Sequence, residues 1–276
     1  MIHDEDLKNC VDYSEGQKKA AYRVLVELVN LFNEYRDDIR IVGGWVPELM
    51  FPNKDHVGSV DVDVLINHLT IEDKGYLTMA RILEKNGYEE HPEKYFSYVK
   101  TVKIGGEEYL VDVDILAGIY GGTVFKKRSQ HVSGIKALKA TGGDFAFKFP
   151  PQQVKIEAAR VDGAIDVATV NVVAVVPYLI MKTAAMGRGK AKDAYDVYFI
   201  IKNYLGGIDA LAEEFKDVSD NREVRDMKEK LQGKFASENH AGPEDVVQFL
   251  DLVDEEEIEL TKRDVFERVN ALLRRI

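Results

Sequence analysis

The stretch Val60-Asp61-Val62-Asp63-Val64-Leu65-Ile66 places apolar residues at alternate positions, with two acidic residues between them. Successive side chains of a β-strand point to opposite faces, so the stretch predicts a strand with both carboxylates on one face. Strands generally disfavour aspartate. Asp61 and Asp63 are therefore candidate functional residues, and the alternative is that they lie on the solvent face of a half-exposed sheet.

The same pattern returns later in the chain. Val111, Val113 and Ile115 form one face of a second predicted strand, and Asp112 and Asp114 form the other face. This strand, expected over 109–116, follows another over 95–104, and the glycine pair between them is typical of a hairpin. Two acidic pairs, each inside a β-branched run, are difficult to explain as solvated surface.

Carboxylates grouped in this way are ligands that Mg²⁺ prefers. Residues i and i+2 of a strand lie about 7 Å apart, at ~3.3 Å per residue, so Asp61 and Asp63 suit two ions about 4 Å apart. A third carboxylate would come from the neighbouring strand, and the sequence leaves open whether it is Asp114 or Asp112. In such a site one ion activates an attacking hydroxyl group, and the other binds a triphosphate and its leaving pyrophosphate.

Two glycines, Gly43 and Gly44, follow a short β-rich run over 39–42 and precede a predicted short helix over 46–50. Glycine lets the backbone approach a phosphate closely, and free N–H groups at a helix start can bind it. An ordinary tight turn is the alternative. The chain from Trp45 to Asp61 is long enough for one helix and a return strand, which would bring the turn beside the carboxylates.

The wider pattern predicts an α+β protein, with a mixed β-sheet flanked by helices and then an α-helical C-terminal region. Helices are expected over 17–36 and 72–86, and further strands over 154–160 and 167–176. From Pro177 onward helical spacing prevails, and helices are predicted over 177–187, 190–204, 208–216, 222–236, 243–252 and 262–275. Two domains are therefore expected, 1–176 and 177–276.

Composition narrows the function classes. The chain has 276 residues and a formal net charge of −11, whereas proteins that follow long stretches of nucleic acid usually carry a basic excess, so extensive duplex binding is disfavoured. The single cysteine, Cys10, leaves no disulfide within the chain and fits a reducing compartment. No signal-peptide pattern and no apolar stretch long enough to span a bilayer are visible, so a cytoplasmic protein is expected.

Three segments in this order resemble the DNA polymerase β-like nucleotidyltransferase superfamily. They are Ile41-Val42-Gly43-Gly44-Trp45, Ser59-Val60-Asp61-Val62-Asp63-Val64 and Val113-Asp114-Ile115-Leu116-Ala117-Gly118. The Gly-Gly-Trp sequence is similar to the branch that holds lincosamide nucleotidyltransferases and AbiEii-type toxins. The resemblance, which runs from about Ile41 to Leu116, implies a nucleotidyltransferase fold for the first domain and an antitoxin as a candidate protein partner.

The resemblance also implies roles for individual residues. Those that it assigns to two Mg²⁺ ions are Asp61, Asp63 and Asp114. Those that it assigns to the phosphates of an NTP substrate are Gly43, Gly44 and Ser59. Relatives often carry Arg-x-Thr or Arg-x-Ser just before the acid pair, and here Val57 occupies the arginine position.

A second stretch is similar to the same group of proteins. Lys182, in an apolar run, is followed by Arg188-Gly189-Lys190-Ala191-Lys192-Asp193-Ala194-Tyr195-Asp196. The resemblance implies that Lys182 meets the triphosphate and that Asp193 braces the nucleotide site. On a helical wheel Asp193 falls within an apolar sector, so it is expected to be buried and paired with Lys182, Arg188 or Lys190. An ordinary ion pair between helices is the alternative.

The predicted activity is the transfer of an NMP from an NTP to a hydroxyl or phosphate acceptor with two Mg²⁺ ions, and Asp114 is also a candidate general base. The acceptor stays open between a tRNA, a protein and an antibiotic-like small molecule. One alternative is a non-catalytic module of the same fold that binds a nucleotide or a partner. Another is a two-metal phosphodiesterase, because the same ligands serve hydrolysis.

Overall fold

The protein is described from a computed structural model, which covers residues 7–71, 73–118, 129–132, 135–159 and 164–276. The described residues form two compact units. The sheet unit contains Tyr13–Met50 and the described part of Gly58–Ala174, and the helical unit contains Leu7–Asp12, Phe51–Val57 and Val175–Ile276. The helical unit thus includes two short segments from the first half of the chain. The predicted ranges 1–176 and 177–276 place these segments in the first domain.

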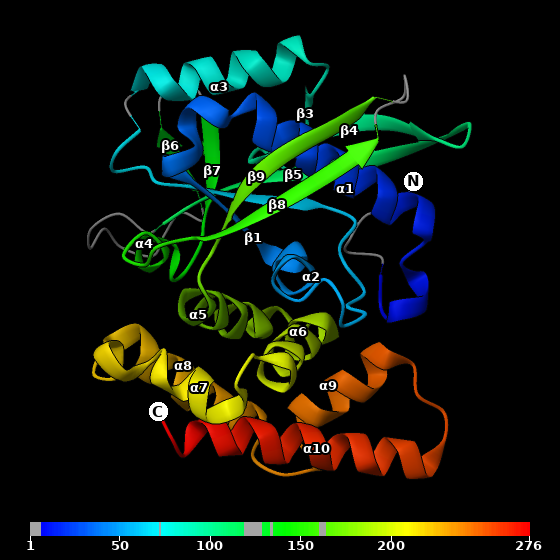
Figure 1. Cartoon of the computed structure of the whole chain (residues 1–276), viewed down its shortest axis with the longest axis vertical. Helices are drawn as coiled ribbons and strands as arrows, with labels where there is room; N and C mark the ends of the chain where they lie inside the picture. Colours follow the sequence, from blue (N-terminus) through cyan, green and yellow to red (C-terminus); the bar gives the residue numbers. More distant parts are fainter. Residues whose placement is uncertain (1–6, 72, 119–128, 133–134, 160–163) are drawn as a thin grey trace. The chain divides into compact units, whose positions relative to one another are not determined.

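The sheet unit is built on a mixed sheet, as the sequence predicts. Its described part has nine strands in the order β3-β4-β5-β2-β1-β9-β8, with β7 beside β5 and β6 beside β7 (Figure 1). The strands are β1 (Ile39–Val42), β2 (Val62–Ile66), β3 (Glu89–Glu90), β4 (Ser97–Ile104), β5 (Glu107–Ala117), β6 (Ser129–Val132), β7 (Ile135–Lys139), β8 (Gln152–Ala159) and β9 (Ile165–Val172). β5 runs parallel to β2 and β7, and β1 runs parallel to β9, whereas the other pairs are antiparallel.

The central strand β2 is held in place by its apolar residues. Val62 and Val64 are fully buried on one face, as their alternation with aspartate predicts. Leu65, on the opposite face, is also fully buried and lies against Gly143. Both faces of β2 are therefore covered toward its C-terminal end, Asp63 lies at the less buried beginning of the strand, and Asp61 lies just before the strand.

Helix α1 (Glu15–Leu31) crosses the strands and contacts β4, β5, β8 and β9 (Figure 1). Ser14 caps its start by accepting a hydrogen bond from the backbone N–H of Gln17. The helix ends earlier than the predicted limit at 36, and Asn33–Asp38 forms a separate 3₁₀ helix. The other helices of this unit are the 3₁₀ turn η4 (Gly43–Trp45), α2 (Val46–Met50), α3 (Asp73–Lys85) and α4 (Gly143–Ala146).

The helical unit confirms the predicted α-helical C-terminal region. Its α-helices are α5 (Val175–Ala185), α6 (Ala191–Asn203), α7 (Gly207–Glu213), α8 (Arg222–Lys234), α9 (Ala241–Leu250) and α10 (Glu255–Leu273), and its 3₁₀ turns are Cys10–Asp12, Met186–Arg188 and Lys216–Val218. The long helix α10 packs against α6, α7, α8 and α9. Fully buried aromatic residues fill the interior of the unit, among them Phe215, Phe235 and Phe249.

Helices α5 and α10 begin earlier than predicted, each for a local reason. Helix α5 begins at Val175, so Pro177 is its third residue; proline is tolerated there because the first N–H groups of a helix have no partner within the helix. Helix α10 begins at Glu255 because Asp254 caps it, accepting from the N–H of Glu257. Acidic residues at a helix start also interact favourably with the helix dipole.

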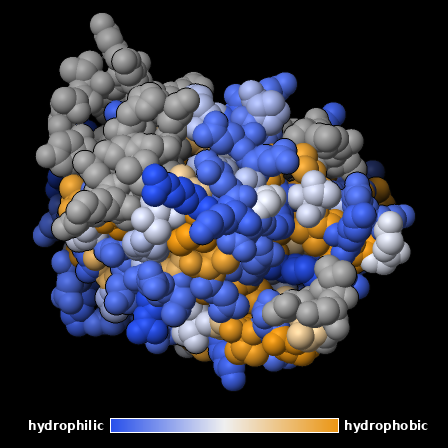
Figure 2. All heavy atoms as spheres, turned by 90° about the horizontal axis from the view of Figure 1, so that it is seen from above, coloured by the Kyte–Doolittle hydropathy of each residue, from blue (hydrophilic) through white to orange (hydrophobic). Residues whose placement is uncertain are grey.

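The molecular surface is mixed in polarity. On the face seen in Figure 2, hydrophilic residues predominate and hydrophobic residues occur in smaller groups between them. Within the described ranges, no helix combines the length and the hydrophobicity needed to cross a membrane.

Candidate functional site

The acidic residues of β2 and β5 lie at the same level of the sheet. Asp63 on β2 and Asp114 on β5 are register partners on adjacent parallel strands. Each of the two strands also has a neighbour on its other edge. Val42 at the end of β1 pairs with Asp63, and Ser97 at the start of β4 pairs with Asp114. Partners in a sheet project their side chains to the same face, so the two carboxylates are neighbours.

The Gly43–Trp45 turn lies directly against Asp63. Gly43 has φ +70°, a conformation that favours glycine, and it follows the register partner of Asp63. A Cβ atom at Gly43 would lie 1.7 Å from Oδ2 of Asp63, so the carboxylate occupies the space that any other side chain would need. The predicted approach of the glycine turn to the acid pair is therefore present in the sheet unit.

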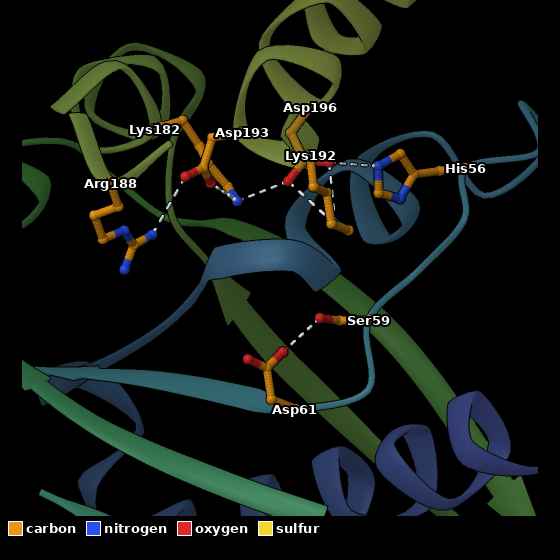
Figure 3. A network of polar contacts seen from close by, with 8 residues as sticks. All are labelled: His56, Ser59, Asp61, Lys182, Arg188, Lys192, Asp193 and Asp196. Atoms are coloured by element: carbon orange, nitrogen blue, oxygen red, sulfur yellow. Dashed lines mark hydrogen bonds and ion pairs between the residues drawn. The ribbon is translucent and has the colours of Figure 1, made fainter. Parts of the chain in front are cut away.

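Asp61 lies just before β2, not inside the strand as the alternation predicts. The indole Nε1 of Trp45 donates to the main-chain carbonyl of Asp61 at 2.8 Å. Ser59 Oγ donates to Asp61 Oδ1 at 2.5 Å (Figure 3). Trp45 itself packs against Tyr22 in α1, with ring centroids 5.4 Å apart. The segment that carries Asp61 is thus fixed to the glycine turn through Trp45, and the side chain of Asp61 is oriented by Ser59.

Asp114 is electrostatically strained. Burial, followed by the negative charge of Asp61, raises the pKa of Asp114 to about 6, although a hydrogen bond from Ser97 acts in the opposite direction. Its Oδ1 atom is buried and has no hydrogen-bond partner among the described residues. A carboxylate in this state gains from a cation or a proton beside it.

The structure separates the two candidates for the third carboxylate. Asp112 Oδ2 accepts from Lys94 Nζ at 3.0 Å and lies 4.0 Å from His91 Nε2, so Asp112 already has a cationic partner. Asp114 is the register partner of Asp63 and interacts with Asp61. This arrangement favours Asp114 over Asp112 as the acid that acts with Asp61 and Asp63.

The donor set of the sheet unit fits Mg²⁺ in its chemistry, since Asp61, Asp63 and Asp114 offer hard carboxylate oxygens. Within the described ranges, no group of three or more His, Cys, Asp or Glu side chains is arranged so that it could hold a metal ion. In this arrangement Asp61 accepts a hydrogen bond from Ser59, and Asp63 lies against Gly43.

Replacement of Gly43 by alanine should cost more stability than the same change at Gly105. Both glycines have positive φ, +70° and +60°, so alanine is strained at either position by about 1–2 kcal/mol. Only at Gly43 does the new methyl group meet a side chain, that of Asp63, whereas the space around Gly105 is open. Urea unfolding of the two variants tests this, and equal losses of stability would contradict the close contact with Asp63.

The helical unit holds a second group of charged residues, here called the ionic network. Its members are His56, Lys182, Arg188, Lys192, Asp193 and Asp196 (Figure 3). Lys182 Nζ lies 2.9 Å from Asp193 Oδ1 and 2.7 Å from Asp196 Oδ2. Arg188 reaches Asp193 Oδ2 at 3.4 Å. The expectation that Asp193 is buried and paired with Lys182 or Arg188 is confirmed, and both cations contribute.

Asp196 is the centre of this network, and it is fully buried. Its Oδ1 atom contacts His56 Nε2 at 2.9 Å and Lys192 Nζ at 3.1 Å, while Oδ2 contacts Lys182. The His56 ring stacks on Tyr195 at 5.2 Å. The sequence indicated Asp196 only as part of a motif. The spacing of four residues between Lys192 and Asp196 on a helix is the sequence feature from which this ion pair could have been predicted.

Burial and charge fix the protonation states of the network. The positive charges of Lys182 and Lys192 hold the pKa of Asp196 well below its usual range despite burial, so Asp196 is ionised. Burial lowers the pKa of His56 to about 4, although the neighbouring Asp196 acts to raise it. His56 is therefore neutral near pH 7, and because Asp196 can only accept, the proton of the imidazole is on Nε2.

The stability of the helical unit should decrease on mild acidification because of His56. The unfolded chain takes up the proton near pH 6.5 and the folded chain only near pH 4, so this contribution is complete above 6.5 and is lost as the pH falls toward 4. Between pH 7.5 and 5 the loss is about 2 kcal/mol. Urea unfolding followed by circular dichroism at several pH values measures it.

The matched variant for that experiment is His56→Gln, which keeps a side-chain N–H donor but does not titrate in this range. The charged groups that face His56 are Asp196, Lys192 and Lys182, and Asp196 is protonated only at much lower pH. The difference in stability between pH 7.5 and 5 should therefore be about 2 kcal/mol smaller in the variant. An identical pH dependence in both proteins would show that His56 is not the responsible group.

Comparisons of the chain with protein-family models, with curated proteins and with solved structures found no match.

Proposed function

We propose that the protein is a Mg²⁺-dependent nucleotidyltransferase that moves an NMP from an NTP to a hydroxyl or phosphate acceptor. The observation that carries the proposal is the pairing of Asp63 with Asp114 on adjacent parallel strands, with the charge of Asp61 acting on Asp114. The contact between Gly43 and Asp63 supports it, because a phosphate-binding turn must lie close to the metal ligands. On this proposal the sheet unit has the nucleotidyltransferase fold.

In the proposed reaction Asp61, Asp63 and Asp114 would hold two Mg²⁺ ions. When bound, the ions supply Lewis-acid activation of the acceptor oxygen and offset the charge of the pyrophosphate. Asp114 is suited to receive the proton of the acceptor hydroxyl because its pKa is raised. The acceptor oxygen then bonds to the α-phosphorus of the NTP, and the bond to pyrophosphate breaks.

Further residues have supporting roles in this proposal. Gly43 and Gly44 present main-chain N–H groups to the phosphates, and Ser59 fixes Asp61. The resemblance assigns Lys182 to the triphosphate, and its ammonium group is paired with Asp193 and Asp196 within the helical unit. The proposed compartment is the cytoplasm, in keeping with the single cysteine and the sequence pattern of the N-terminus, and the resemblance makes an antitoxin a candidate partner.

The test is incubation of the purified protein with each NTP and Mg²⁺, together with tRNA, candidate proteins or aminoglycoside- and lincosamide-like compounds. Release of pyrophosphate and an acceptor heavier by one NMP, seen by mass spectrometry, are the expected results. Asp61→Asn serves as the inactive control. Release of free phosphate or a nucleoside monophosphate without an adduct would indicate hydrolysis instead, and NTP binding that is indifferent to Mg²⁺ would indicate a non-catalytic module.

A further inference from the structure

His56 is joined to the ionic network in a way that fixes its orientation. The segment that carries it, Phe51–Val57, belongs to the helical unit although it is far from α6 in the sequence. The His56 ring stacks on Tyr195 and meets Phe199 edge-on, with centroids 4.7 Å apart. At the start of the segment Phe51 also packs against Phe199, at 6.5 Å. Ring contacts with Tyr195 and Phe199 therefore hold the imidazole in addition to its hydrogen bond.

The hydrogen bonds divide the two oxygens of Asp196 between different partners. His56 Nε2 donates to Oδ1, and Lys182 Nζ donates to Oδ2 at 2.7 Å. A carboxylate can rotate about its bond to Cβ, so a donor fixed on one oxygen also fixes the direction of the other. Lys192 is a weaker constraint, since its ammonium lies 3.1 Å from Oδ1 and 3.2 Å from Oδ2 and so favours neither oxygen.

We infer that His56 is a positioning residue, which acts through Asp196 to set the position of the Lys182 ammonium group. The consequence for catalysis rests on the proposed function, in which Lys182 contacts the triphosphate. His56 touches neither substrate nor metal in this scheme. A neutral imidazole suits the role, because it adds a donor to the buried carboxylate without adding another charge that would compete with Lys182.

Two substitutions separate the hydrogen bond from the packing. His56→Phe keeps an aromatic ring beside Tyr195 and Phe199 but removes the donor, and His56→Gln keeps an N–H donor but removes the ring. If the hydrogen-bond donor of His56 positions Lys182, the phenylalanine variant should lose this positioning and the glutamine variant should retain it. If only the packing of the ring matters, the glutamine variant should lose the positioning and the phenylalanine variant should retain it.

The first readout is independent of activity. In ¹⁵N-labelled protein, the buried and paired ammonium of Lys182 should exchange its protons slowly and give its own NMR signal, assigned by its absence in Lys182→Met. The signal should shift or broaden in His56→Phe and persist in His56→Gln. Lys192→Met should leave it in place, which keeps the inference testable if His56→Phe does not fold. An unchanged signal in a folded His56→Phe, or its loss in Lys192→Met, would overturn the inference.

The second readout is steady-state kinetics with NTP and Mg²⁺. Loss of one hydrogen bond to a charged group predicts a KM for NTP about 10-fold higher in His56→Phe, with kcat nearly unchanged and recovery in His56→Gln. Equal kinetics in the phenylalanine variant and the wild type would reject the role of His56. If the wild type transfers no nucleotide, the proposed function fails, and the NMR signal still decides whether His56 positions Lys182.

Discussion

Replacing Asp114 by asparagine is expected to lower the rate of nucleotidyl transfer by about 10³-fold or more, whereas the same change at Asp112 should leave the rate within about threefold. The two residues are of one type on one strand, and both belong to the acidic face predicted from the sequence. They differ in their partners, because Asp112 is paired with Lys94 and Asp114 lies beside Asp63 and Asp61. Asp112→Asn is thus a matched control.

The measurement is kcat/KM from pyrophosphate release at saturating Mg²⁺, with circular dichroism to establish that both variants are folded. Asp114→Asn removes a negative charge from a buried, like-charged environment, so its stability should be equal to or above that of the wild type. Asp112→Asn weakens the ion pair with Lys94 and should be slightly less stable. Comparable losses of activity in both variants would mean that Asp112 belongs to the site, and full activity of Asp114→Asn would reject the proposed third ligand.

The sequence was sufficient to predict the parts of the site that have a local pattern. The alternation in β2 and β5 predicted which residues face the core. When the two strands are adjacent, Asp63 and Asp114 become neighbours. The position of Asp61 outside the strand could not be predicted, because it depends on hydrogen bonds from Ser59 and Trp45. Such bonds leave no periodic signal in the sequence.

The ionic network shows the same limit over longer range. Burial of Asp193 was predicted from its place among apolar residues on α6, and a cationic partner followed from the cost of burying a lone charge. The contact between His56 and Asp196 joins residues that are 140 positions apart, so no local spacing could predict it. Only the fold of Phe51–Val57 onto the helical unit reveals it.

Removal of the Asp196 carboxylate should have the largest effect on stability. Asp196→Ala would leave Lys182 and Lys192 nearly buried, with one carboxylate, Asp193, in reach of Lys182. Breaking a buried ion pair by deleting one partner costs about 3–5 kcal/mol, since the desolvated charge that remains is not compensated. The matched control is Asp264→Ala in the same unit, whose partly exposed ion pair with Arg268 and hydrogen bond from Tyr198 predict a loss of about 1–2 kcal/mol.

A double substitution tests the cause of that loss. If the cost arises from the ammonium groups that lose Asp196, Lys192→Met should destabilise the wild type but partly rescue Asp196→Ala, giving a coupling energy of about 1–3 kcal/mol in a double-mutant cycle from urea unfolding. If the cost arises only from lost packing, the two substitutions should be additive. Coupling would also bear on function, because a carboxylate that stabilises two buried lysines through charge is able to hold the ammonium of Lys182 in one place for a substrate.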